Sequence, residues 1–160
     1  MKIKGLKDED FVNYKKPSMF ISTAICDWKC CTEQNLDKSI CQNSELAKTE
    51  TVEYPIDKLY NRYITNPITS AIVIGGLEPF LQSEEVYALV KYVRGKGCKD
   101  DIIIYTGYYR EEIQKEITRL KSFPNIVIKY GRYVPSGKEH FDNVLGVKLV
   151  SENQYAERIS

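Results

Sequence analysis

The 160-residue chain is long enough for one domain with a core of its own. Its 23 Lys and Arg and 22 Asp and Glu give a net charge of +1, which provides no basic surface for binding nucleic acid. No apolar stretch approaches the roughly 18 residues that a membrane span needs, and the charged residues 1–10 offer no apolar signal region. These features predict one soluble, cytoplasmic domain over residues 1–160 that binds neither nucleic acid nor membrane.

Strand-like and helix-like segments alternate along the chain. The strand candidates are short runs rich in Ile and Val, at residues 19–25, 71–74, 102–105 and 126–130. Apolar residues at helical spacing predict helices at residues 55–64, 83–95 and 113–120. Residues 144–150 are a candidate for a last strand.

This alternation predicts an α/β domain with a mostly parallel sheet. At about 30 residues per βα unit, the chain has room for four or five units and not for the eight of a closed barrel. We therefore expect an incomplete (βα) barrel. Such a barrel leaves one side of its sheet open, and a partner protein is one candidate to cover it.

Four of the five cysteines lie within sixteen residues, directly after the first predicted strand. They are Cys26, Cys30, Cys31 and Cys41. Thiolates gathered on one loop bind soft metal centres such as zinc, copper(I) and iron–sulfur clusters. A disulfide framework is the alternative, but it is typical of small secreted domains that lack a large core. The sequence favours a metal site in a reducing compartment.

Glycine-containing motifs follow the other three predicted strands. They read Gly75-Gly76-Leu77-Glu78-Pro79, Tyr105-Thr106-Gly107-Tyr108 and Tyr130-Gly131-Arg132. Each motif alone is consistent with an ordinary turn. Ligands of parallel α/β sheets bind outside the carboxyl ends of the strands, where glycine lets them approach the backbone closely. Three such strand ends beside a thiol cluster therefore predict a ligand that lies across them.

In this order the motifs resemble the radical S-adenosylmethionine superfamily, and most closely the small activating enzymes of anaerobic ribonucleotide reductase. The resemblance covers most of the chain. Besides the Gly75 motif, it is carried by Cys26-x3-Cys30, Cys41-Gln42-Asn43, Asp10-Phe11-Val12-Asn13 before Phe20-Ile21, Ile104-Tyr105-Thr106-Gly107-Tyr108 and Ser151-Glu152-Asn153-Gln154.

The cysteine spacing departs from the family pattern, Cys-x3-Cys-x2-Cys. Glu33 stands where the third cysteine is expected, and Cys41 matches that position if eight residues are inserted after Cys30. Cys31 is the competing candidate, although adjacent thiolates rarely both reach one cluster. The resemblance thus implies that Cys26, Cys30 and Cys41 ligate a [4Fe-4S] cluster.

Three thiolates leave one iron of the cluster open, because such clusters normally take four cysteines. The resemblance implies that this iron holds the amino and carboxylate groups of S-adenosylmethionine. Gly75 and Gly76 would offer backbone carbonyls to the amino group, with Glu78 holding that turn. Lys129 and Arg132 are candidates for the carboxylate, with solvated surface positions as the alternative for both.

Further ligand contacts are expected from neighbouring strand ends. Tyr105 and Thr106 are candidates for the ribose or adenine side of S-adenosylmethionine. Asn43 is a candidate for a hydrogen bond to the ligand or for a cap of the cysteine loop. Glu78 has an alternative role as a carboxylate at a helix N-terminus.

The resemblance implies an enzyme, a radical S-adenosylmethionine oxidoreductase of the glycyl-radical-activating type. It would cleave S-adenosylmethionine reductively to a 5′-deoxyadenosyl radical and install a glycyl radical on a partner such as anaerobic ribonucleotide reductase. A flavodoxin or ferredoxin is the implied electron donor.

Three other functions stay open. A zinc module would use the loop cysteines, with His140 as a possible fourth ligand. A plain electron-transfer iron–sulfur protein would use all four loop cysteines, Cys31 included. A radical enzyme of the same superfamily could also act on a small molecule or a peptide.

Overall fold

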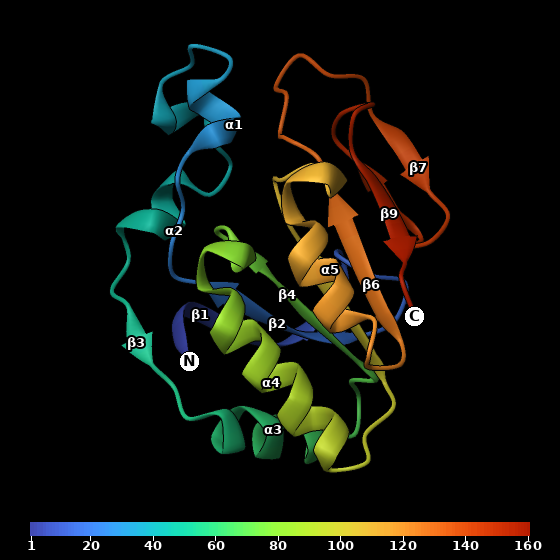
Figure 1. Ribbon diagram of the computed structural model, residues 1–160. Helices are drawn as coiled ribbons and strands as arrows, with labels where there is room; N and C mark the ends of the chain where they lie inside the picture. The colour runs from blue at the N-terminus through green and yellow to red at the C-terminus, as the bar shows by residue number, and fades with distance from the viewer.

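The computed structural model describes residues 1–160 as a seven-stranded sheet with helices packed on one face (Figure 1). The strand order is β3-β1-β2-β4-β5-β6-β9, and β7 and β8 form a separate hairpin. The strands are β1 Lys2–Asp10, β2 Ser18–Thr23, β3 Val52–Glu53, β4 Ala71–Gly76, β5 Asp101–Tyr105, β6 Ile126–Tyr130, β7 His140–Asp142, β8 Val147–Leu149 and β9 Tyr155–Arg158.

The sheet is open and mixed, so the expected incomplete (βα) barrel with a mostly parallel sheet is wrong. The pairs β2·β4, β4·β5 and β5·β6 are parallel, whereas β1·β3, β1·β2 and β6·β9 are antiparallel. Residues 11–17, which join β1 to β2, are too few for the helical crossover that a parallel pair needs. The expectation that a partner covers the open side of a barrel loses its structural basis.

The helices are short, and three of them match the helical patterns of the sequence. Helices α3, α4 and α5 coincide closely with the predicted segments 55–64, 83–95 and 113–120. The helices are α1 Lys29–Thr32, α2 Ser44–Lys48, α3 Ile56–Ile64, α4 Ser83–Gly95 and α5 Gln114–Leu120, with 3-10 turns η1 Lys38–Ile40, η2 Pro79–Gln82 and η3 Arg110–Ile113. None of them is long and apolar enough to cross a membrane.

The core lies on both faces of the central strands. Alternate residues such as Ile74, Ile104 and Ile128 pack beneath α3, α4 and α5. The residues between them, including Val73 and Ile103, pack beneath the β1–β2 connection and the β7–β8 hairpin. Because both faces are covered, the central strands read as continuous apolar runs, and this made them visible in the sequence.

The central strands bring the distinctive motifs to one end of the molecule. Strands β2, β4, β5 and β6 run parallel, so their carboxyl ends meet at the same edge. Helix α1, which carries Cys30 and Cys31, and helix α2, which follows Cys41, lie toward the end to which β6 points (Figure 1). The cysteines and the glycine motifs therefore converge.

Candidate iron–sulfur centre

A cavity of about 270 Å³ lies at the carboxyl ends of the parallel strands. Three of the four loop cysteines line it, Cys26, Cys30 and Cys41. The cavity continues along the sheet face that the β7–β8 hairpin covers, where Phe20 and Tyr105 form part of its wall. This volume is close to the lower end of the range for small-molecule sites, roughly 300–1,000 Å³.

The cysteine loop is built from short turns that follow β2. Thr23 at the end of β2 donates its hydroxyl to the Gly75 carbonyl at 2.9 Å, so the loop leaves the sheet beside the tip of β4. Trp28 then adopts a left-handed conformation, with φ of 63°, and α1 begins at the next residue with Cys30 inside it. Cys41 follows η1, whose cap Asp37 accepts a hydrogen bond from the Ser39 amide at 2.9 Å.

The other two cysteines lie outside this cavity. Cys31 is 2% exposed and does not line it, because successive residues of a helix point in different directions. The Cys31 thiol lies instead beside the backbone of Cys41. Cys98 lies in the turn after α4, with its sulfur 3.6 Å from an Asp100 carboxylate oxygen.

The geometry lends no support to a single zinc ion. All five cysteines are free thiols, and no three Cys, His, Asp or Glu side chains lie close enough together to hold one ion. His140, the only histidine, is in β7 and does not line the cavity.

Burial disfavours ionisation of the cavity thiols, and two cations counteract this at Cys30. Burial raises the pKa of Cys26 to about 12. Burial also raises the pKa of Cys30, but the Tyr133 backbone amide and the positive charges of Arg132 and Lys129 oppose that rise. Metal binding requires thiolates, so cations beside Cys30 favour the form of the thiol that binds iron.

Glu78 ties the tip of β4 to the tip of β5. Its carboxylate accepts hydrogen bonds from the Thr106 hydroxyl at 2.7 Å, the Gly107 amide at 2.9 Å and the Phe80 amide at 3.1 Å. Burial raises the pKa of Glu78, which is 5% exposed. The side chain therefore holds the turn and caps η2, and its carboxylate is occupied by protein donors.

The two glycines expected to bind the ligand differ in position. Gly76 lines the cavity with a φ of 81°, a conformation that favours glycine. Gly75 does not line it. A side chain at Gly75 would meet Tyr105 Cβ at 3.1 Å and the Phe20 ring at 3.3 Å, so this glycine makes room for two aromatic walls.

The other residues that were expected to contact the ligand do not all line the cavity. Tyr105 lines the cavity, and its hydroxyl donates to the Asn13 carbonyl. Thr106 is buried, does not line the cavity and donates to Glu78. Asn43 lines the cavity, and its side chain makes no capping hydrogen bond to α2.

Lys129 places a buried amine in the cavity without a carboxylate partner. It is 6% exposed, and its Nζ donates to the Gly131 carbonyl at 3.1 Å. Burial lowers its pKa to about 8. Lys129 is thus not the solvated surface residue that was the alternative for it, and an anion that enters the cavity would meet its amine.

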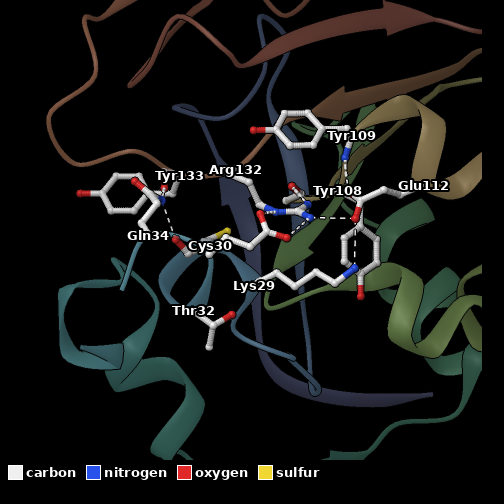
Figure 2. Close-up of polar contacts among 12 residues, drawn as sticks. Lys29, Cys30, Thr32, Gln34, Tyr108, Tyr109, Glu112, Arg132 and Tyr133 are labelled. Carbon is white, nitrogen blue, oxygen red and sulfur yellow. Dashed lines mark hydrogen bonds and ion pairs between the residues drawn. The ribbon is translucent and has the colours of Figure 1, made fainter. Parts of the chain in front are cut away.

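Sequence reasoning missed the contact between Gly107 and Cys30, and it expected a different role for Arg132. Gly107 lies against Cys30, since a Cβ at Gly107 would be 3.0 Å from the Cys30 sulfur. Arg132, named as a candidate for the carboxylate or as a solvated surface residue, does not line the cavity and is 3% exposed. It lies in a network of ion pairs with Glu33 and Glu112, next to α1 (Figure 2). The only sequence signal for Arg132 was its place directly after the Tyr130-Gly131 strand end.

The donors present fit an iron–sulfur cluster. Three thiols open onto one cavity, two cations lie near one of these thiols, and the wall away from the thiols is partly apolar. The cavity also contains Gln154, whose buried Oε1 atom has no hydrogen-bond partner within the protein. A soft, thiolate-bound group is what this donor set prefers.

Comparison with known families agrees with this chemistry. Residues 17–155, most of the chain and all of the cysteine loop, match the model of a family described as a 4Fe-4S single cluster domain. The chain matches no curated protein and no solved structure. The thiols that gather at the strand ends are thus those of an iron–sulfur protein, and the chain belongs to the family of 4Fe-4S single cluster domains.

Proposed function

We propose that this iron–sulfur protein binds S-adenosylmethionine beside its cluster and cleaves it reductively. The observation that carries the proposal is the cavity, which extends from Cys26, Cys30 and Cys41 to Gly76 and Lys129 and excludes Cys31. The same cavity reaches past the thiols to Phe20, Tyr105 and Leu149, and an electron carrier has no need of such an extension. Three ligands leave one iron free for a substrate.

In this proposal Cys26, Cys30 and Cys41 hold the [4Fe-4S] cluster. When bound and reduced, the cluster would supply one electron to the sulfonium of S-adenosylmethionine, whose C5′–S bond would break to give methionine and a 5′-deoxyadenosyl radical. A flavodoxin or ferredoxin would be the donor of that electron.

The protein's own residues would bind and orient the substrate. The Lys129 amine, free of any carboxylate, suits the methionyl carboxylate. Gly76 presents bare backbone where the ligand must come close. The Tyr105 ring suits a flat apolar group such as adenine, because its hydroxyl is already bonded to Asn13.

The direct test is the production of 5′-deoxyadenosine. Protein reconstituted anaerobically with iron and sulfide is mixed with S-adenosylmethionine and a strong reductant, and 5′-deoxyadenosine and methionine are measured. We expect both in equal amounts from the wild-type protein and none from Cys41→Ala. A cluster that can be reduced but yields no 5′-deoxyadenosine would rule the proposal out.

Simple electron transfer is the second candidate, and the position of Cys31 favours it. Cys31 is buried beside Cys41 and next in sequence to Cys30, so a modest movement of the loop would add a fourth thiolate. Four thiolates would leave no open iron. In that case Cys31→Ala should lose the cluster as readily as Cys26→Ala does.

We further propose that the hydrogen donor for the radical is a glycine of a partner enzyme, as in the activating enzymes that the motifs resemble. The test mixes reconstituted protein, S-adenosylmethionine and reductant with a candidate partner and records the electron paramagnetic resonance spectrum. A glycine-centred doublet on the partner would support activation. If a small molecule or peptide accelerates 5′-deoxyadenosine release and no partner shows the doublet, the enzyme acts on that compound.

A further inference from the structure

Glu33 and Arg132 join the cysteine loop to the end of β6. Glu33 is the residue at which α1 ends, and Arg132 lies two residues beyond β6. We propose that this ion pair anchors the cysteine loop to the sheet and holds Cys30 at the cavity before any cluster is bound. The inference rests on Cys26, Cys30 and Cys41 as cluster ligands, which the proposed function also uses.

The contact between these two residues is bidentate. Arg132 Nε lies 2.9 Å from one carboxylate oxygen of Glu33, and Arg132 Nη2 lies 2.9 Å from the other. The planar guanidinium matches a carboxylate in this geometry, which fixes direction as well as distance. The pair therefore restrains the orientation of the end of α1 as well as its position.

Arg132 is itself held rigidly. Its Nη2 donates to Glu112 at 2.8 Å and its Nη1 donates to the Gly107 carbonyl. The guanidinium lies near the rings of Tyr108 and Tyr109, at 5.4 and 4.9 Å from their centroids (Figure 2). At 3% exposure, Arg132 is a fixed attachment point and not a mobile surface charge.

Two further contacts hold α1 against the residues that follow β5 and β6. Gln34 Nε2 donates to the Tyr133 carbonyl at 2.8 Å and also to the carbonyl of Cys30 (Figure 2). Lys29, at the start of α1, pairs with Glu112 at 3.0 Å and lies over the Tyr108 ring. Cys30 is thus enclosed in a helix that is tied down at both ends.

The anchor explains the unusual residue at position 33. In the cysteine pattern of the radical S-adenosylmethionine superfamily, this position carries a cysteine. Here the Glu33 side chain bonds to Arg132 and does not line the cavity. Four residues without stabilising contacts could not form a helix, because isolated helices this short are unstable in water. The ion pair supplies those contacts from the sheet, and Cys41 is left to complete the thiol set.

The experiment compares Glu33→Gln with Glu84→Gln in the full chain before reconstitution. Glu84 is the control because it also makes a bidentate pair with an arginine, Arg119, between α4 and α5, and this pair is more exposed than that of Glu33. The measurement is hydrogen exchange of the backbone amides of residues 29–36. We expect about tenfold faster exchange in Glu33→Gln, from the loss of one charge-assisted contact, and no change there in Glu84→Gln.

Two further readouts separate anchoring from general stability. The exchange of the β4 and β5 amides should be unchanged in both variants. Cluster assembly, followed by visible absorbance after adding iron and sulfide, should be several-fold slower in Glu33→Gln and reach the same final content. Glu33→Asp should recover part of the rate because it keeps the carboxylate.

A double variant tests the direction of the position-33 side chain. Glu33→Cys combined with Cys41→Ala recreates the cysteine spacing of the family pattern, yet it should bind little iron, because position 33 faces Arg132. Full iron binding in that variant, or equal exchange in Glu33→Gln and Glu84→Gln, would overturn the inference. None of these measurements uses S-adenosylmethionine, so their results do not depend on whether the protein cleaves it.

Discussion

A Cβ atom on Gly107 would lie only 3.0 Å from the sulfur of Cys30. The β5 tip and the thiol are therefore in direct contact, although the two residues are far apart in the sequence. The same Cβ would lie 3.6 Å from a carboxylate oxygen of Glu78, which accepts the Gly107 amide. Gly107 thus fixes how deeply Cys30 can sit against the sheet.

Gly107→Ala should consequently impair cluster binding. The added methyl must displace Cys30 or shift the β5 tip, and overpacking of this kind typically costs about 1–3 kcal/mol. We expect reduced iron and sulfide content after reconstitution. Gly95→Ala is the control, since a Cβ there meets nothing within 4 Å, and it should retain the wild-type content.

The cysteines should divide into two groups when each is replaced by alanine. Cys26→Ala, Cys30→Ala and Cys41→Ala should each lose most of the iron and sulfide, because these thiols line the cavity. Cys31→Ala and Cys98→Ala should keep it. Iron and sulfide analysis after anaerobic reconstitution decides the matter, and a cluster that survives without Cys41 but not without Cys31 would reverse the assignment.

The central strands and the thiol site could be predicted because their signals are local. Strands β4, β5 and β6 are buried on both faces and read as runs of Ile and Val. The cysteine loop is visible from its spacing alone. Parallel strand order then brings the loop and the glycine motifs to one edge without further information.

The edges of the sheet could not be predicted in the same way. Strand β1 reads Lys-Ile-Lys-Gly-Leu-Lys-Asp-Glu-Asp and β9 reads Tyr-Ala-Glu-Arg, with few apolar residues in either. These strands pair with neighbouring strands through backbone hydrogen bonds. No pattern of side chains in their sequences predicts such pairing. Missing these antiparallel strands led to the wrong prediction of an incomplete barrel.

The role of Arg132 was hidden for a related reason. Its carboxylate partners Glu33 and Glu112 are 99 and 20 residues away in the sequence. An isolated arginine after a strand looks like a solvated residue until the fold closes around it. Contacts between distant charged residues need the three-dimensional arrangement and cannot be read from local patterns.

The buried carboxylate of Asp101 and its half-exposed cationic partners should make stability depend on pH. The Asp101 carboxylate accepts from Tyr14 Oη at 3.0 Å, Lys16 Nζ at 2.7 Å and Arg158 Nη2 at 2.8 Å. Burial alone would raise the pKa of Asp101, but the hydrogen bonds from Lys16, Arg158 and Tyr14 outweigh it and hold the pKa below its ordinary value of 3.8. A lowered pKa means that the stabilisation is present above pH 3.8 and is lost as the pH falls through the lowered value.

Asp101→Asn should therefore lower the free energy of unfolding at pH 7 by about 2 kcal/mol, the contribution of hydrogen bonds to a charged group. The difference from wild type should shrink in acid, as the wild-type carboxyl becomes protonated. Urea unfolding at several pH values measures both effects. Asp8→Asn is the control, because Asp8 and its partner Arg62 are both more than 40% exposed, and a surface pair of this kind contributes little. A difference that stays constant down to low pH would contradict the assignment.

Substitutions at Gly76 and Gly97 distinguish the effect of backbone strain from the effect of contact with the ligand. Both have a positive φ, 81° and 80°, so alanine at either position costs roughly 1–2 kcal/mol of strain. Around Gly97 the space is empty, whereas a Cβ at Gly76 would meet Leu46 at 2.9 Å and Ser22 at 3.0 Å. Gly76→Ala should lower the unfolding midpoint more than Gly97→Ala, and Gly76→Val more still.

The same pair tests the proposed pose of S-adenosylmethionine. Gly76 lines the cavity, and a valine there would be crowded by Leu46 and Ser22 and would shift the backbone of the strand tip against which the ligand is proposed to lie. In reconstituted Gly76→Val, iron content should hold while the affinity for S-adenosylmethionine, measured by equilibrium binding, falls by about tenfold or more, equivalent to at least ~1.4 kcal/mol. Gly97→Val, which carries similar backbone strain away from the cavity, should bind the ligand as the wild type does. An unchanged affinity in Gly76→Val would show that the ligand does not lie against this strand tip.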